Sequence, residues 1–232
     1  MIELIFAIVV MGLVLMSIPE ITRQSIQSTY TAYQQEAIAT LASHIQTVMS
    51  QEWDNENNQS VGYPVLQTSS TAIPSCTTPY PIGTSDAEGR YCTDTSGNYR
   101  SASAIGPDAD DIYGFDDIDD YDGNVTTVTL YGGESISTET GEYVDLNVTI
   151  GTTVSYGDDT PRTAGGSVSS LGQTTRYSNP FNGPLPSTTS NIKLISVRLS
   201  TVNPAMELDK NITLSAFMCN IGAPKKYYGQ YK

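Results

Sequence analysis

The chain has 232 residues, with 25 acidic against 11 basic side chains and a formal net charge of −14. This shortage of Lys and Arg argues against a nucleic-acid-binding protein, because such proteins neutralise phosphates with clustered cations. With one histidine (His44) and three cysteines (Cys76, Cys92 and Cys219), the chain has few ligands for a zinc site and no catalytic triad without His44. We therefore expect no enzyme, and one globular domain with an accessory element.

Residues 1–53 predict one long α-helix. Residues 4–18 are apolar except for Gly12 and Ser17, a run that spans a bilayer only if the helix continues on either side. Because no basic residue precedes the run and no small-residue cleavage site follows it, we expect it to be kept rather than removed as a signal peptide. From Ile26 the apolar residues recur three or four apart. They are Ile26, Tyr30, Tyr33, Ala37, Leu41, Ile45, Val48 and Met49. The helix therefore divides into a hydrophobic part, 1–24, and an amphipathic part, 25–53.

Pro19 lies at the end of the apolar run. A proline inside a helix removes one backbone hydrogen bond and crowds the preceding turn, so we expect a kink or a locally melted turn that lets the helix bend. In the alternative interpretation, Pro19 only marks the point at which a single-pass anchor leaves the membrane.

Residues 54–232 predict a β-rich head with long loops. Four stretches are rich in Val, Ile, Thr and Leu and are flanked by Gly, Asn or Asp, which is typical of strands. They are 125–131, 143–155, 192–201 and 212–219. The short connection at 132–135 favours antiparallel pairing, and no second amphipathic helix is present for a parallel crossover. The expected fold class is α+β, with a long N-terminal α-helix packed on an antiparallel β-sheet head.

The first 25 residues resemble a known family. The tripeptide Ile-Glu-Leu at 2–4 opens the apolar helix, Gly12 follows, and Pro19 lies near its end. This arrangement resembles the N-terminus of type IV pilins and of the related type II secretion pseudopilins. The resemblance implies a pilin-like fold, removal of a leader by a prepilin peptidase and methylation of the new N-terminus. In that family the glutamate lies four residues after the mature N-terminus. Since Glu3 lies two after Met1, we expect either that two residues are missing or that the start differs.

The resemblance also implies that Glu3, Gly12 and Pro19 serve assembly. A carboxylate at membrane depth costs free energy when it has no partner. Docking beside the free amine of a neighbouring subunit neutralises both charges and favours one register, so that Glu3 would act as an assembly latch. The alternative is a glutamate hydrated among the lipid headgroups, which needs no partner.

The function implied by this resemblance is that of a structural subunit of a bacterial type IV pilus. Such a subunit waits in the inner membrane and then joins an extracellular filament that serves adhesion, motility or DNA uptake. Its partners would be other copies of itself, the inner-membrane pilus assembly machinery and, before assembly, the membrane. One alternative is a pseudopilin of a type II secretion system. Another is a single-pass membrane-anchored binding domain.

An acidic segment at 115–123, FDDIDDYDG, is similar to a turn in pilin-like proteins of the mannose-sensitive haemagglutinin type. Its carboxylates are candidate calcium ligands. They are Asp117, Asp119, Asp120 and Asp122. The spacing of an EF-hand fails because Ile118 occupies the first ligand position, so we favour a solvated acidic turn and no cofactor. Asp117 and Asp120 also suggest a glycosidase pair, but no pattern of an aromatic-lined cleft accompanies them.

The cysteines predict one disulfide. Cys76 and Cys92 bracket a loop rich in Pro, Gly and Thr, and closing such a loop stabilises a protein by ~3 kcal/mol. We favour this pair, with Cys219 as a small buried apolar residue. In the alternative, Cys219 is the partner, because C-terminal loops of pilins are often closed by a disulfide.

Four asparagines begin the sequence N-x-[ST] without an intervening proline, and each has an acid two residues before it. They are Asn58, Asn124, Asn147 and Asn211. This extended pattern resembles the acceptor of bacterial oligosaccharyltransferases, which implies a glycoprotein. In the alternative, acid-flanked Asn-x-Thr strings simply mark strand starts after turns.

Overall fold

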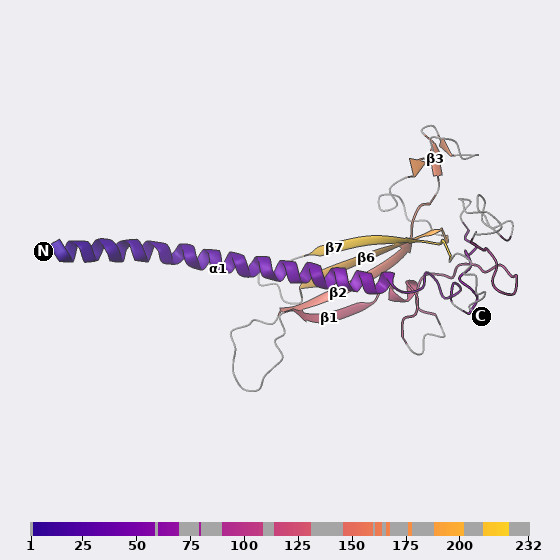
Figure 1. The fold of residues 1–232 in the computed structure, drawn as a ribbon, viewed down its shortest axis with the longest axis horizontal. Helices are drawn as coiled ribbons and strands as arrows, with labels where there is room; N and C mark the ends of the chain where they lie inside the picture. The colour runs from indigo at the N-terminus through magenta and orange to yellow at the C-terminus, as the bar shows by residue number, and fades with distance from the viewer. Residues whose placement is uncertain are drawn as a thin grey trace, which may run out of the picture.

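The computed structural model describes residues 2–58, 60–69, 79, 90–108, 114–130, 146–159, 161–163, 166–167, 176–177, 188–201 and 211–222. In these residues one long helix, α1 (Ile2–Met49), projects from a β-rich head (Figure 1). The expected α+β architecture is therefore confirmed, and the helix ends four residues before the predicted boundary at 53.

Among the described residues, helix α1 meets the head through its C-terminal half. Its 48 residues correspond to about 70 Å at 1.5 Å per residue. The buried side chains recur at intervals of four, four and three residues, which places them on one face. They are Ala37, Leu41, Ile45 and Val48. All residues from 2 to 29 are exposed, so the N-terminal half extends beyond the head (Figure 1).

Helix α1 also continues through Pro19. The expected melted turn is therefore absent from the single chain, although proline still leaves one carbonyl of the preceding turn without its helical donor. Two hydroxyls form additional hydrogen bonds near this position, from Ser17 Oγ to the carbonyl of Val14 (2.8 Å) and from Thr22 Oγ1 to that of Ile18 (3.0 Å). A break at Pro19 inside an assembled filament stays a prediction.

The main sheet has four antiparallel strands in the order β1-β2-β6-β7. They are β1 (Val125–Leu130), β2 (Leu146–Tyr156), β6 (Ile192–Thr201) and β7 (Ile212–Cys219). All four predicted strands are confirmed, and the bounds of β6 and β7 agree at both ends. The connection predicted at 132–135 lies outside the described residues.

A second, smaller sheet has the order β4-β3-β5. Its strands are β3 (Pro161–Thr163), β4 (Gly166–Ser167) and β5 (Arg176–Tyr177). A single 3-10 turn, η1 (Asp119–Tyr121), precedes β1. The sequence did not predict these elements because two or three residues are too few to show a period.

The hydrophobic core lies between α1 and one face of the main sheet. Side chains alternate along the strands, so that Val148 and Ile150 of β2 and Ile195 and Val197 of β6 join the buried face of α1 in one cluster. The opposite face carries mainly Ser, Thr and Asn side chains with Arg198, and it also exposes Val125 and Phe217. The sheet is therefore apolar towards the helix and mainly polar on its outer face.

His44 links α1 to this sheet. Its Nε2 lies 2.9 Å from Oγ1 of Thr152, a buried residue of β2. Its ring also meets Tyr121 edge-on, with centroids 6.2 Å apart. Burial lowers the pKa of His44, which favours a neutral ring that fastens the helix to the sheet.

Candidate functional site

The first candidate site is the exposed N-terminal half of α1. Its large apolar side chains are exposed by 44% or more between Ile2 and Ile21. They are Ile2, Leu4, Ile5, Phe6, Ile8, Val9, Val10, Met11, Leu13, Val14, Leu15, Met16, Ile18 and Ile21. This apolar surface surrounds the helix, whereas a soluble monomer rarely exposes a large contiguous apolar patch. It therefore requires lipid or other apolar surfaces as its environment.

By length and composition, α1 is able to cross a membrane. The most apolar window of the helix is entirely unburied, which distinguishes it from the core helix of a soluble protein. A membrane anchor and a signal sequence share this character. The helix is therefore compatible with membrane association, as an anchor or as a signal sequence.

The residues predicted to serve assembly all lie in this exposed half. Glu3 is in the first turn, where a carboxylate complements the positive end of the helix dipole. A Cβ added to Gly12 would meet nothing within 4 Å, so no contact among the described residues requires a glycine there. Glycine destabilises a helix interior by ~1 kcal/mol relative to alanine, so the described contacts of the monomer do not explain why a glycine stands at position 12.

The second candidate site is built from the acidic segment, which is buried rather than solvated. Asp117, Asp119 and Asp120 are at most 2% exposed. Asp117 Oδ1 accepts hydrogen bonds from the backbone amides of Asp119 (2.8 Å) and Asp120 (3.2 Å). Asp120 Oδ2 accepts in turn from the amides of Asp116 (2.9 Å) and Asp117 (3.1 Å). The prediction of a solvated acidic turn is therefore wrong, because these carboxylates satisfy backbone donors that would otherwise be buried without a partner.

The segment after α1 brings this acidic turn to the sheet. The carbonyl of Glu52 accepts a hydrogen bond from the amide of Ile118 (3.1 Å), and Asp117 Oδ2 accepts one from the amide of Asn55 (2.6 Å). These two bonds place Asp54 beside Asp119, although the two residues come from different segments of the head.

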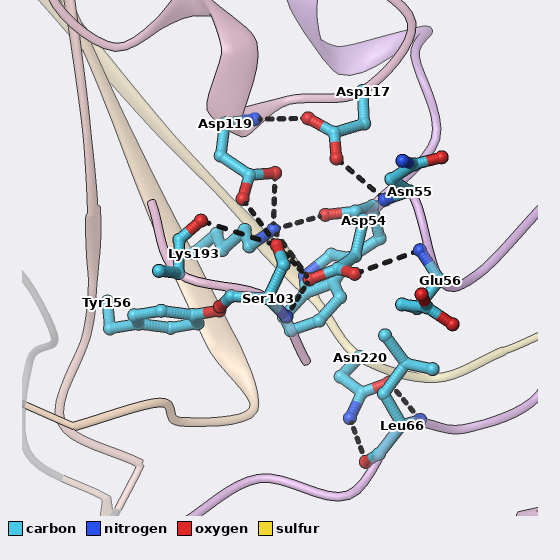
Figure 2. Close-up of polar contacts among 12 residues, drawn as sticks. Asp54, Asn55, Glu56, Leu66, Ser103, Asp117, Asp119, Tyr156, Lys193 and Asn220 are labelled. Carbon is cyan, nitrogen blue, oxygen red and sulfur yellow. Dashed lines mark hydrogen bonds and ion pairs between the residues drawn. The ribbon is translucent and has the colours of Figure 1, made fainter. Parts of the chain in front are cut away.

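Lys193, near the start of β6, lies between these two carboxylates (Figure 2). Its side chain is 0% exposed. Nζ donates to Asp119 Oδ1 at 2.6 Å, to Asp54 Oδ2 at 3.2 Å and to the carbonyl of Trp53 at 2.7 Å. Nζ also lies 4.4 Å from the centroid of the Trp53 ring and 5.8 Å from that of Tyr156. A buried cation is thus held by two carboxylates, one carbonyl and two aromatic rings.

Further hydrogen bonds fix the carboxylates and the ring around Lys193. Ser103 donates through its amide to Asp54 Oδ2 (3.0 Å) and through Oγ to Asp119 Oδ2 (3.0 Å). The hydroxyl of Tyr156 donates to the carbonyl of Ser103 (2.8 Å). Both the lysine and its acidic partners are therefore rigidly positioned.

Burial shifts the acids of this cluster towards their protonated forms. Desolvation raises the pKa of Asp54 despite the opposing charge of Lys193. Desolvation, together with a side-chain hydrogen bond to Asp119, raises the pKa of Asp117 to about 9. Burial likewise raises the pKa of the Tyr156 phenol. The low-dielectric surroundings thus favour the protonated form of Asp117.

The proposed calcium ligands have other partners here. Asp122 Oδ1 accepts a hydrogen bond from the amide of Val154 (2.8 Å), and Asp117, Asp119 and Asp120 are bound as described above. In the described part of the chain, no group of three or more His, Cys, Asp or Glu side chains is arranged to hold a metal ion.

Asp54 and Lys193 were missed by sequence reasoning. Lys193 had a visible signal, because it occupies the inward position of a strand whose next inward residues, Ile195 and Val197, are buried and apolar. A charge at a core position of an alternating strand predicts a buried ionic partner. The partner itself had no local signal.

The structure describes two of the three cysteines. Cys92 is buried and disulfide-bonded, whereas Cys219 is a free thiol of intermediate exposure whose pKa is raised by burial. Cys76, the partner predicted for Cys92, lies outside the described residues.

Three of the four candidate glycosylation sites lie at the main sheet. Asn147 is exposed on its outer face, where its Oδ1 accepts from Thr129 Oγ1 (2.8 Å). Asn211 is exposed just before β7, and its Oδ1 accepts from the guanidinium of Arg198 (3.0 Å). Asn124, just before β1, is half-buried. Asn147 and Asn211 are therefore the accessible members of this group.

Asn58, the fourth candidate, lies in a turn after α1. Its Nδ2 donates to the carbonyl of Asn55 (2.8 Å), and its Oδ1 accepts from the amides of Ser60 (3.0 Å) and Val61 (3.3 Å). Because the reacting amide nitrogen is held inside the turn, Asn58 requires local opening before modification.

Asn220, just after β7, fastens a loop to the end of the sheet. Its Nδ2 donates to the carbonyl of Leu66 (2.7 Å), and its Oδ1 accepts from the amide of the same residue (2.9 Å), as Figure 2 shows. The side-chain amide thus replaces the hydrogen bonds that a neighbouring strand would make.

No family model, curated protein or solved structure matches the chain. Functional inference for this chain therefore depends on its own surfaces, contacts and charges. Its most informative features are the exposed half of α1 and the buried cluster around Lys193.

Proposed function

We propose that the protein is a structural subunit of a bacterial type IV pilus, which polymerises through the N-terminal half of α1 into an extracellular filament. The observation that carries this proposal is the apolar helix surface that remains exposed from Ile2 to Ile21 while the head is folded on the other half of the helix. Adhesion, motility or DNA uptake would be downstream roles of that filament.

An exposed helix of this kind suits both stages of pilus assembly. Before assembly, its apolar surface is solvated by lipid in the inner membrane, where the pilus assembly machinery meets the subunit. In the filament, the same surface packs against the helices of other copies. Because both environments are apolar, the subunit moves from one to the other without exposing the helix to water.

The polar outer face of the head is compatible with the outside of a filament. Asn147, Asn211 and Arg198 lie on or beside this face, opposite the core and α1. A glycan on either asparagine would therefore extend into solvent without disturbing the helix bundle. The head would coat the filament while α1 forms its centre.

In a filament, Glu3 and Gly12 would make contacts with neighbouring subunits that a single chain does not provide. The Glu3 carboxylate would pair with the N-terminal amine of a neighbouring subunit and select the axial register. Gly12 would allow a neighbouring helix to approach closely, because small residues reduce the distance between helix backbones in apolar surroundings.

Substitution of Glu3 by Gln tests the proposal. The variant is expected to insert in the inner membrane in normal amounts but to give few filaments, measured as sheared pili by electron microscopy and as membrane-bound subunit by immunoblot. Glu20→Gln, the same change at an exposed position of the same helix, is the matched control and should assemble normally.

Other outcomes would contradict this proposal in different ways. Normal filament yield from Glu3→Gln would exclude the latch. Absence of filaments from the unmodified protein, together with a requirement for it in type II secretion, would favour the pseudopilin. Absence of both would leave a single-pass membrane-anchored binding domain.

A further inference from the structure

The side chain of Lys193 is held in a position that is costly for an ammonium ion. Removing a lysine or a carboxylate from water costs several kcal/mol per ion, and attraction between the ions often fails to offset this penalty. Here Lys193 and Asp54 have no exposed side-chain surface, and Asp119 has 2%. A reaction that removed the charges would relieve the penalty.

The geometry places an amine beside a carboxyl group in a dry site. Nζ of Lys193 is 2.6 Å from Oδ1 of Asp119, and the rings of Trp53 and Tyr156 border the lysine. Holding two reactants at contact distance replaces a bimolecular encounter with an effectively unimolecular step. The reacting groups are also shielded from hydrolysis by the surrounding core.

Two further acids are placed to move protons between these groups. Asp54 Oδ2 lies 3.2 Å from Nζ, so it is able to accept a proton from the ammonium group. Asp117 Oδ1 accepts a hydrogen bond from the backbone amide of Asp119 (2.8 Å), which places Asp117 beside the residue that would be attacked, and burial raises the pKa of Asp117 to about 9. A base beside the nucleophile and an acid beside the electrophile are the elements of general acid–base catalysis.

We propose that Lys193 and Asp119 form an intramolecular amide cross-link by an autocatalytic reaction within the folded head. Asp54 takes a proton from the Lys193 ammonium, and Asp117 gives a proton to the Asp119 carboxylate. The free amine then attacks Cγ of Asp119, forming the N–C bond. The nitrogen returns a proton to Asp117, and the C–O bond breaks as the leaving hydroxyl takes the proton from Asp54.

The products are one amide and one water, and both acids regain their starting protonation states. No oxidant, reductant or activated co-reactant is required, because an ammonium and a carboxylate condense with loss of water. The lysine and aspartate charges disappear, so the desolvation penalty of this pair disappears with them. The backbone carbonyl of Trp53, 2.7 Å from Nζ, is positioned to accept the amide N–H of the product.

The cross-link would close a long loop between η1 and β6. The two residues are 74 positions apart, and β6 is an inner strand of the main sheet. Such a bond restricts the unfolded chain as a disulfide does, without depending on redox conditions. This inference stands independently of the pilus proposal, since it uses only contacts inside the head.

Mass spectrometry of the reduced full-length protein in detergent tests the inference. For protein produced in a host that neither glycosylates nor methylates it, the expected intact mass is lower than that of the polypeptide by one water. Trypsin does not cleave after a lysine whose side-chain amine is acylated. The digest should therefore lack cleavage at Lys193 and contain a branched peptide that joins Lys193 to Asp119. Lys193→Met and Asp119→Ala should each restore the full mass, and Asp117→Ala should slow the reaction strongly.

Arg198→Met, an exposed position on the same strand, is the matched control and should retain the cross-link. Full mass of the unmodified protein with ordinary tryptic cleavage after Lys193 would overturn the proposal and leave an ion pair. This measurement needs only the natural sequence, so it decides the question even where a variant fails to fold.

Discussion

The helix and the head each place residues where soluble domains rarely do: the helix exposes large apolar side chains, and the head buries a lysine. Phe6 of α1 is 72% exposed, whereas Lys193 of β6 is fully buried. Ordinary soluble domains bury their large apolar side chains and keep lysine at the surface. The exposed helix therefore favours an apolar environment outside the monomer. The buried lysine needs neighbouring groups inside the head that offset the cost of removing its charge from water.

The two halves of α1 show the same contrast along a single helix. Leu41 is 0% exposed against the sheet, whereas Leu15 is 65% exposed. Both are leucines in regular helix, so the difference lies only in what surrounds them. Substitutions at matched positions are able to separate head stability from assembly.

Lys193→Met is expected to have the largest effect on stability. It removes the buried partner of the Asp54 and Asp119 carboxyl groups together with the proposed cross-link, and it should lower the free energy of unfolding by at least about 3–5 kcal/mol. Denaturant unfolding of the full chain in detergent, monitored by Trp53 fluorescence, measures this loss. Arg198→Met on the exposed face should change stability little, and equal stability of the two variants would contradict the role of the buried cluster.

The leucine pair gives the next largest effect. Leu41→Ala creates a cavity between helix and sheet and should lower the free energy of unfolding by about 2–5 kcal/mol. Leu15→Ala should leave unfolding of the head unchanged and instead reduce filament yield. If Leu15→Ala destabilised the head as much as Leu41→Ala does, the division of α1 into two independent halves would be wrong.

Asp117 predicts a pH dependence of smaller size. Its folded-state pKa is raised from 3.8 to about 9, so between these values the folded head keeps a proton that the unfolded chain releases. The contribution of Asp117 to stability is therefore greatest below about pH 4 and is lost as the pH rises towards 9. Thermal unfolding from pH 4 to 9 should show a steeper decline for the natural protein than for Asp117→Asn. Parallel profiles would show that Asp117 ionises normally.

The asparagines should have the smallest effect on stability. Asn147→Gln and Asn211→Gln change exposed side chains and should alter the free energy of unfolding by less than about 0.5 kcal/mol. In the native host, each substitution should remove one glycan from the protein, measured by intact mass. A natural protein with no added mass would exclude glycosylation at all four candidate sites.

The periodicity of apolar residues in the sequence was sufficient to predict the long helix and the four strands of the main sheet. The four strands and α1 were predictable because their apolar residues repeat at the spacing of strand or helix over six or more positions. Lys193 was visible as a charged residue at an inward strand position. Its partners were not, since Asp54 and Asp119 lie 139 and 74 residues away and only the folded chain brings them together. Local sequence likewise could not show that the acidic turn is buried.

The exposed half of α1 also acts as a spacer. From Ile2 to Tyr30, the first residue of α1 that is not fully exposed, the helix rises by about 40 Å. In the described part of the chain, the head therefore lies too far from the tip of its own helix to contact it, and substitutions in the main sheet should leave the surface of that tip unchanged. The same helix is consequently able to carry heads of different size and surface. The sequence of the head can change without changing the exposed end of the helix.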